Sequence, residues 1–177
     1  MKTSVLLLAL LAVTIPVSAD EADQYYRQGM AAIQQGNPDA AKAAFQTALK
    51  LRPDHAQARY QLGQLPARAE GLKAQRRENE IGSIMLPAID FEEVALSEAL
   101  AALGQMIETE SARTLGEDKA LVPNFMVQDP GGDLGSKEVT LRLKNIPAKA
   151  AINYLLQQVS ATARYDEHAT VVRPAKK

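Results

Sequence analysis

The sequence contains no cysteine and no tryptophan, and its 177 residues include only three phenylalanines and two histidines. Without cysteine the chain cannot form disulfides, thiolate metal sites, a cysteine nucleophile or a lipid-modified N-terminal cysteine. The histidines, His55 and His168, are far apart, and neither has a second histidine at metal-ligand spacing. So few large aromatic residues predict modest cores built mainly from leucine, isoleucine, valine and alanine.

Sequence motifs of common enzyme classes are also missing. No phosphate-binding loop, nucleophile elbow or dinucleotide fingerprint occurs. Asp129 and Asp133 flank a Pro-Gly-Gly sequence but lack the alternating oxygen ligands and the closing glutamate of a calcium loop, so turn formation explains them better. We therefore expect a protein that is not an enzyme and that binds neither a metal ion nor a cofactor.

Long apolar runs are absent except at the N-terminus. Lys2 precedes an apolar run from Val5 to Ile15, and the small residues Ser18-Ala19 follow. This order is typical of a secretory signal peptide, and the run is shorter than the roughly 20 residues that a transmembrane helix needs. We expect cleavage after Ala19, removal of residues 1–19, and a periplasmic or secreted product that is not inserted in a membrane.

The charge is nearly balanced, with 20 basic and 21 acidic residues. Only one of these, Lys2, lies in the expected signal peptide, so the exported chain stays slightly acidic. This balance gives no electrostatic reason to expect nucleic acid or an anionic membrane surface as a partner.

Residues 20–65 predict a module of three helices. Cap and break signals at residues 36–38 and 52–54 separate expected helices at 21–35, 39–51 and 55–65. The segment resembles a tetratricopeptide repeat, a helix-turn-helix unit of 34 residues. Gly63 lies 34 residues after Gly29, so the array is expected to contain about one and a half repeats. The residues that match the first repeat are Tyr25, Gly29, Ala32, Ala41, Phe45, Ala48 and Pro53.

The first expected helix carries a second apolar stripe, formed by Tyr26, Met30 and Ile33 at spacings of four and three. In the tetratricopeptide family this face lines the concave groove that binds partner segments, and Tyr60 would lie on the neighbouring helix. The resemblance therefore implies a peptide- or helix-binding groove formed by these four residues. The alternative is that the C-terminal half of the protein covers the stripe, because so short an array needs intramolecular support.

Residues 66–83 mix acidic and basic side chains with few apolar ones, which predicts a charged linker or a solvated helix. Lys73, Arg76 and Arg77 lie beside several glutamates in this segment. We interpret them as part of a solvated face rather than as a basic binding patch.

Residues 84–177 contain a strand-then-helix pattern twice, at a constant offset of 52 residues. Alternation of apolar residues followed by spacings of three and four predicts a strand buried on one face and then a helix. With further strands near 123–127, 162–165 and 169–173, the pattern predicts the order βαββαββ and an α+β fold for the chain. The matched apolar pairs are Ile89/Leu141, Phe91/Leu143, Val94/Ile146, Ala99/Ala151, Leu100/Ile152, Leu103/Leu155 and Ile107/Val159.

This C-terminal half resembles the short N-terminal domain shared by secretins and signal-transducing TonB-dependent outer-membrane receptors. The likeness covers residues 84–174 and rests mainly on core positions, which indicate fold more than function. It implies a periplasmic setting, beside a secretion, pilus or outer-membrane receptor system. The residues that carry it are Ile89-Asp90-Phe91, Ala99-Leu100, Phe125-Met126-Val127, Val139 to Leu143, Asn145-Ile146-Pro147, residues 151–156 and Ala163-Arg164-Tyr165.

We therefore expect an exported, non-enzymatic adaptor that binds a protein or peptide of the cell envelope. A sheet edge at Val171 is a second candidate surface, because an edge strand can recruit a partner through main-chain hydrogen bonds. Two alternatives stay open. The protein is a self-associating dimer whose repeat segments pair, or it binds a small molecule or glycan through the long turn at 129–136.

Overall fold

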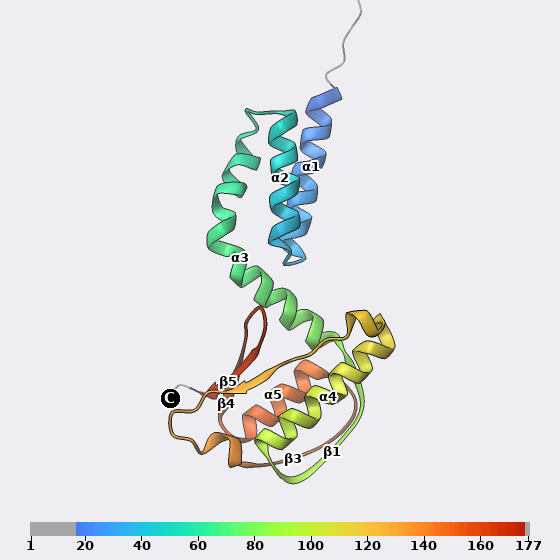
Figure 1. Ribbon diagram of the computed structural model, residues 1–177, viewed down its shortest axis with the longest axis vertical. Helices are drawn as coiled ribbons and strands as arrows, with labels where there is room; N and C mark the ends of the chain where they lie inside the picture. Colours follow the sequence, from blue (N-terminus) through green and yellow to red (C-terminus); the bar gives the residue numbers. More distant parts are fainter. Residues whose placement is uncertain (1–16, 176–177) are drawn as a thin grey trace, which may run out of the picture.

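The computed structural model describes residues 17–175, with a helical N-terminal part followed by an α+β part (Figure 1). The predicted α+β class and the predicted βαββαββ order are confirmed, with two short 3-10 helices between the longer elements. The elements are α1 (Val17–Gln34), α2 (Pro38–Leu51), α3 (Ala56–Ser83), β1 (Met85–Ala95), α4 (Leu96–Leu115), η1 (Glu117–Lys119), β2 (Phe125–Val127), η2 (Leu134–Ser136), β3 (Glu138–Pro147), α5 (Ala148–Gln158), β4 (Ala161–Tyr165) and β5 (Thr170–Pro174).

The expected signal peptide, residues 1–19, lies mostly outside the described residues. Helix α1 begins at Val17, before the expected cleavage site, rather than near residue 21. Across residues 17–175, none of the helices combines the length and the apolarity that crossing a membrane would require.

Local capping signals set the starts of α2 and α3. The side chain of Asn37 accepts a hydrogen bond from the backbone N–H of Ala40 at 3.1 Å, and Pro38 occupies the first turn of α2. Gly36 adopts a φ of 68°, a conformation that strains other residues. His55 caps α3, with its Nδ1 3.4 Å from the backbone nitrogen of Ala58. The short turns therefore fix the three-helix module.

Helix α3 is much longer than predicted. It was expected to end near residue 65, but it continues to Ser83, so residues 66–83 are helical. Pro66 lies inside it, and α3 visibly changes direction along its length in Figure 1. A proline removes one helical hydrogen bond, which is a common cause of such a bend. Leu65 and Leu72 of α3 belong to the N-terminal core and Ile81 to the C-terminal core, so one helix joins both.

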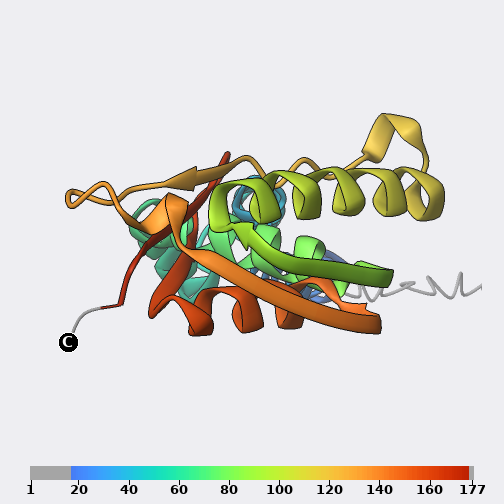
Figure 2. The same cartoon turned by 90° about the horizontal axis from the view of Figure 1, so that it is seen from below.

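Two small sheets enclose α4 and α5. Strands β1 and β3 form an antiparallel pair, while the second sheet has the order β2-β5-β4, with β2 parallel and β4 antiparallel to β5. Helix α4 contacts β1 and β2, and α5 contacts β3 and β4, so the helices form a middle layer (Figures 1 and 2). The predicted apolar stripe of α4 is confirmed as core. Its members Leu96, Leu100, Leu103 and Ile107 are at most 1% exposed.

The 52-residue repeat is visible in the backbone of the C-terminal half. In the β1–β3 pair, Asp90 lies opposite Arg142, which is its counterpart in the repeat. Both strands bend before their helices at a left-handed residue, Glu93 with φ 49° and Asn145 with φ 50°, and these positions are also 52 apart. The two halves are therefore related by an approximate two-fold axis that passes between β1 and β3.

The same symmetry holds for the hydrogen bonds at the two helix starts. The N–H of Leu96, the first residue of α4, donates to the carbonyl of Lys137 just before β3 at 2.8 Å. The N–H of Ala148, the first residue of α5, donates to the carbonyl of Ile84 just before β1, also at 2.8 Å. Each helix is thus anchored to the strand of the other half.

The prediction that Val171 marks a sheet edge is wrong. Val171 lies in β5, the central strand of its sheet, and is 3% exposed. Strands β4 and β5 form a hairpin. On its other side β5 pairs in parallel with β2, which comes from much earlier in the sequence. The outer strands are therefore β2 and β4. A proline at Val171 would break the sheet rather than test strand addition.

Candidate interaction surfaces

Helices α1 and α2 pack as a tetratricopeptide-type hairpin. A Cβ atom on Gly29 would lie 2.4 Å from a ring carbon of Phe45. Phe45, Ala41 and Ala48 are all completely buried. The prediction that Phe45 fills the space left by these small residues is confirmed.

The four predicted groove residues have very different exposure. Ile33 is only 8% exposed and belongs to the N-terminal core, and Tyr26 and Met30 are partly buried against that core. Helix α3 contributes to the same core, so the stripe packs largely within the helical module. Tyr60, by contrast, is 65% exposed on α3. Of the four, Tyr60 therefore offers the largest free surface, and their role in binding stays a prediction.

The ring of Tyr26 packs between Phe45 and a polar cluster formed by Asp23, Arg52 and His55. Its ring centre is 5.9 Å from that of Phe45 and 5.1 Å from that of His55. His55 is 2% exposed, and its Nε2 lies 3.1 Å from Oδ1 of Asp23. The Arg52 guanidinium donates hydrogen bonds to the same carboxyl group, which lowers the pKa of Asp23. These contacts tie the start of α1 to the turn between α2 and α3.

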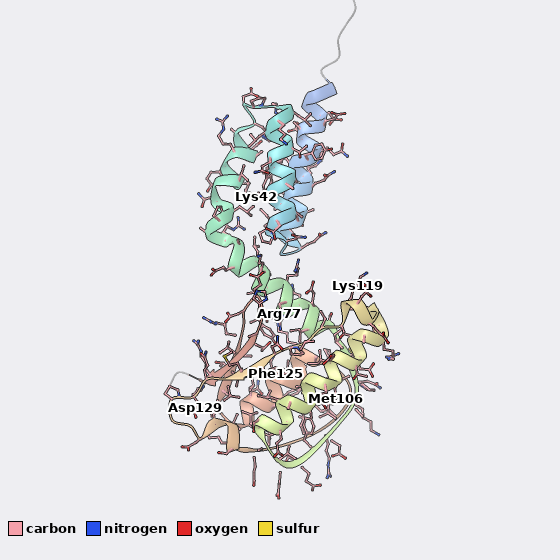
Figure 3. The ribbon with its side chains drawn as sticks, viewed as in Figure 1. Lys42, Arg77, Met106, Lys119, Phe125 and Asp129 are labelled. Carbon is pink, nitrogen blue, oxygen red and sulfur yellow. The ribbon has the colours of Figure 1, made fainter. Side chains whose placement is uncertain are left out.

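Helix α3 begins like the first helix of a second repeat, but in the described part of the chain it continues to Ser83 instead of turning back. Within residues 17–175, and apart from the adjoining residues and backbone of α3 itself, a Cβ atom built on Gly63 would meet nothing within 4 Å. A groove of about 210 Å³ lies between α2 and α3 near Gly63. It is lined by Leu62 and Pro66 of α3 and by Lys42 of α2, which Figure 3 labels. The groove was not predicted from the sequence, although residues 66–80 lack the alanine and phenylalanine pattern that would complete a second repeat, which was an available signal.

A second groove, of about 310 Å³, lies between α4 and β2. Leu100 and Gly104 of α4 and Phe125 of β2 line it, and Figure 3 shows Phe125 between these elements. A Cβ atom on Gly104 would lie 3.7 Å from the Phe125 ring, so helix and strand are close here. The neighbouring Met126 is 49% exposed. Because β2 is an outer strand, it replaces Val171 as the candidate sheet edge, and this groove lies beside it.

Of the three basic residues predicted to lie on a solvated face of α3, Arg76 is exposed, whereas Lys73 and Arg77 contact the C-terminal domain. The Arg77 guanidinium is half-buried and donates hydrogen bonds to the backbone carbonyls of Val122 at 2.7 Å and Pro123 at 2.9 Å. Nζ of Lys73 lies 2.9 Å from the carboxylate of Glu167, and this bond lowers the pKa of Glu167. Figure 3 shows Arg77 where α3 meets the α+β domain. The second half of α3 is thus docked on that domain.

The long turn at 129–136 is held by Asp129. Its carboxylate accepts backbone hydrogen bonds from Leu134 at 2.8 Å and Gly131 at 3.0 Å, and these bonds lower the pKa of Asp129. Turn formation therefore accounts for Asp129. Within residues 17–175, no group of three or more metal-ligating side chains is arranged to hold a metal ion.

Comparison with known proteins supports the helical module. Residues 26–75 match the family model of the tetratricopeptide repeat. The match extends past Gly63, so it includes the start of a second repeat as predicted. Tetratricopeptide repeats are typical of protein–protein interaction modules. No curated protein and no solved structure gives a significant match to the chain.

Proposed function

We propose that this protein is an exported adaptor that binds another envelope protein through its repeat module. The observation that carries the proposal is the tetratricopeptide match over residues 26–75, on which Tyr60 is largely exposed. Repeat modules of this kind bind segments of other proteins on their helical surface. Exposed aromatic side chains supply much of the affinity in such contacts.

The N-terminal sequence and the C-terminal domain support an envelope location. The apolar run from Val5 to Ile15 and the following Ser18-Ala19 fit a secretory signal peptide. The βαββαββ order of the C-terminal domain is the order expected from its resemblance to the short N-terminal domain of secretins and TonB-dependent receptors. We therefore place the protein beside a secretion, pilus or receptor system, where its C-terminal domain would bind a second component.

The groove between α4 and β2 is the second candidate surface. An outer strand such as β2 can extend its sheet by pairing with a segment of a partner. Phe125 and Met126 would then contact the partner's side chains, whereas the contact at Tyr60 would involve the repeat module alone. The two surfaces lie in different domains, so mutations can separate them.

The test uses the exported chain, residues 20–177, as bait in a native envelope extract, followed by binding measurements with each captured protein in purified form. Tyr60→Ala should weaken binding by about tenfold or more, as expected for an exposed aromatic anchor. Tyr154→Ala is the matched control, because Tyr154 is 49% exposed but lies on α5. Loss of binding in Met126→Ala alone would contradict binding through the repeat module and indicate β2 as the contact site.

Two further results would contradict the proposal. One is that no captured protein binds in purified form. The other is that every captured protein binds Tyr60→Ala and Met126→Ala as tightly as it binds the unmodified chain. Export is tested separately by N-terminal sequencing of the periplasmic protein. The first residue found should be Asp20.

A further inference from the structure

The first repeat shows which kind of helix completes a repeat in this protein. Helix α2 returns antiparallel to α1 and places Phe45 against Gly29, with Ala41 four residues before and Ala48 three residues after the aromatic ring. All three side chains of α2 are fully buried. A stripe of small, aromatic and small residues on an antiparallel helix is therefore the matching surface for the repeat glycine.

Among the residues that the structure describes, no such helix covers the corresponding position on α3. Gly63 lies 34 residues after Gly29, and the space that its Cβ atom would enter is open. Tyr60 and Ala67, one turn before and one turn after Gly63, are both exposed, as is Pro66. We call this face, formed by Tyr60, Gly63, Pro66 and Ala67, the helix seat. Leu62 and Leu65 border it in the groove beside α2.

The segment that would follow by repeat spacing cannot occupy the helix seat. Residues 72–85 stand 34 positions after α2, but Asn79 replaces Phe45 and Gln75 replaces Ala41. Instead of turning back, most of this segment continues α3. The contacts of Lys73 with Glu167 and of Arg77 with the carbonyls near β2 hold it on the C-terminal domain. Within residues 17–175, the segment that repeat spacing would place on the seat is therefore held elsewhere.

The charges along this face favour an antiparallel helix. Arg59 lies one turn before Gly63, and Glu70 lies two turns after it, both exposed. A helix that runs antiparallel to α3, as α2 runs to α1, brings its positive N-terminal end near Glu70 and its negative C-terminal end near Arg59. Each end of the helix dipole then lies near a side chain of opposite charge.

We propose that the helix seat binds an amphipathic helix of a partner protein, one that carries an aromatic residue between two small residues and completes the second repeat. This inference rests on the proposed function and names the binding element of its partner. A second copy of this chain offers such a stripe on α2 and also on α1, where Ala22 and Gly29 flank Tyr26 at the same spacings. Both stripes are already packed in their own hairpin, since Gly29 and Tyr26 lie against Phe45 and Phe45 is completely buried. The occupant is therefore a helix of a different protein.

The probe for this site is a fluorescent peptide with the sequence of residues 37–52, which contains the α2 stripe. The peptide should bind the exported chain, and a peptide with Phe45→Ala should not. Gly63→Leu in the protein should weaken binding of the peptide by about tenfold or more, because the leucine fills the space for the aromatic ring. The fold should tolerate this change, since the space around Gly63 is open.

Gly71→Leu is the matched control. Gly71 lies on the same helix with equally open surroundings, so this variant should bind the peptide like the unmodified protein. Failure of the unmodified protein to bind the peptide, or equal binding by Gly63→Leu, would overturn the proposal. A dimer in sedimentation that Gly63→Leu converts to a monomer would also overturn it, because the occupant would then be a second copy.

The captured partner separates this proposal from the proposed function. If its binding is lost in Tyr60→Ala but unchanged in Gly63→Leu, the adaptor function stands and the helix seat is overturned. If the peptide binds at Gly63 while no envelope protein is captured, the helix seat stands and the adaptor function is contradicted.

Discussion

Gly29 and Gly63 occupy the same position of successive repeats but have opposite surroundings. Gly29→Ala should lower the free energy of unfolding by about 1–3 kcal/mol, because its new methyl group would overlap the Phe45 ring. Gly63→Ala should raise it by about 0.5–1 kcal/mol, since alanine favours helix and meets no neighbour. Denaturant unfolding of both variants measures the difference. Equal changes of the same sign would contradict the packing of α1 against α2.

Phe45 itself should contribute most of the core of the first repeat. Because it is completely buried, Phe45→Ala should lower the free energy of unfolding by about 3–5 kcal/mol. Denaturant or thermal unfolding measures this loss, with the exposed Tyr154→Ala as the control. A loss below about 1 kcal/mol would mean that α1 and α2 do not pack as a repeat.

Tyr165 should titrate at unusually high pH. Burial, helped by the nearby charge of Glu78, raises the pKa of Tyr165 from 10.0 to about 12. Because folding raises this pKa, the stabilisation is present below pH 10 and is lost as the pH rises through about 12. Ultraviolet titration of tyrosinate should show a last step that disappears in Tyr165→Phe. A last step that persists in this variant would refute the assignment.

At the scale of elements, the bends that end the paired strands β1 and β3 carry backbone strain. Glu93 and Asn145 both have left-handed φ angles, which are unfavourable for residues with a side chain by about 1–2 kcal/mol. Glycine relieves this strain but loses about 0.5–1 kcal/mol of entropy, so Glu93→Gly should stabilise the fold by up to about 1 kcal/mol. Asn145→Gly should gain less, since asparagine tolerates this conformation better. Thermal unfolding that shows a clear loss in Glu93→Gly would contradict this account.

Elements with a strong local period could be predicted from the sequence. In the stripe from Leu96 to Ile107 and in the two units 52 residues apart, the spacing of apolar residues indicates which face is buried. For this reason α4, α5 and the strands before them were predicted correctly. The continuation of α3 through Pro66 was missed, because contacts with two cores outweigh the local break signal. The central position of Val171 was missed as well, since the parallel pairing of β2 with β5 joins distant segments and leaves no local pattern.

The candidate site was predicted only in part for the same reason. The 34-residue spacing identified the repeat, and the exposure of Tyr60 fits the predicted surface. Ile33 belongs to a core that includes Leu65 and Leu72 of α3, and the course of α3 could not be read from local spacing. The open face at Gly63 exists because residues 72–83 dock on another domain. Arg77, which makes part of that contact, has no sequence signature beyond its charge.

For the whole molecule, α3 fixes the position of the repeat module relative to the C-terminal domain. Its first half packs in the N-terminal core, and its end comes so close to α5 that a Cβ atom on Gly82 would lie 2.9 Å from Cβ of Lys149. Arg77 adds hydrogen bonds to the carbonyls of Val122 and Pro123 between these points. A partner held on the repeat module would therefore keep a defined orientation to anything bound by the C-terminal domain.

Arg77→Met should loosen this joint, because it leaves the two carbonyls without their charged donor. Hydrogen bonds from charged groups contribute about 1.5–3 kcal/mol each, so amide exchange should accelerate across residues 72–83 while the α1–α2 hairpin stays protected. Small-angle scattering should show a broader range of shapes. Arg76→Met is the matched control, because Arg76 pairs with Glu80 on α3 itself at 3.5 Å. If both variants exchange and scatter alike, Arg77 does not hold the joint, and the packing around Gly82 and Ile81 alone fixes the two domains.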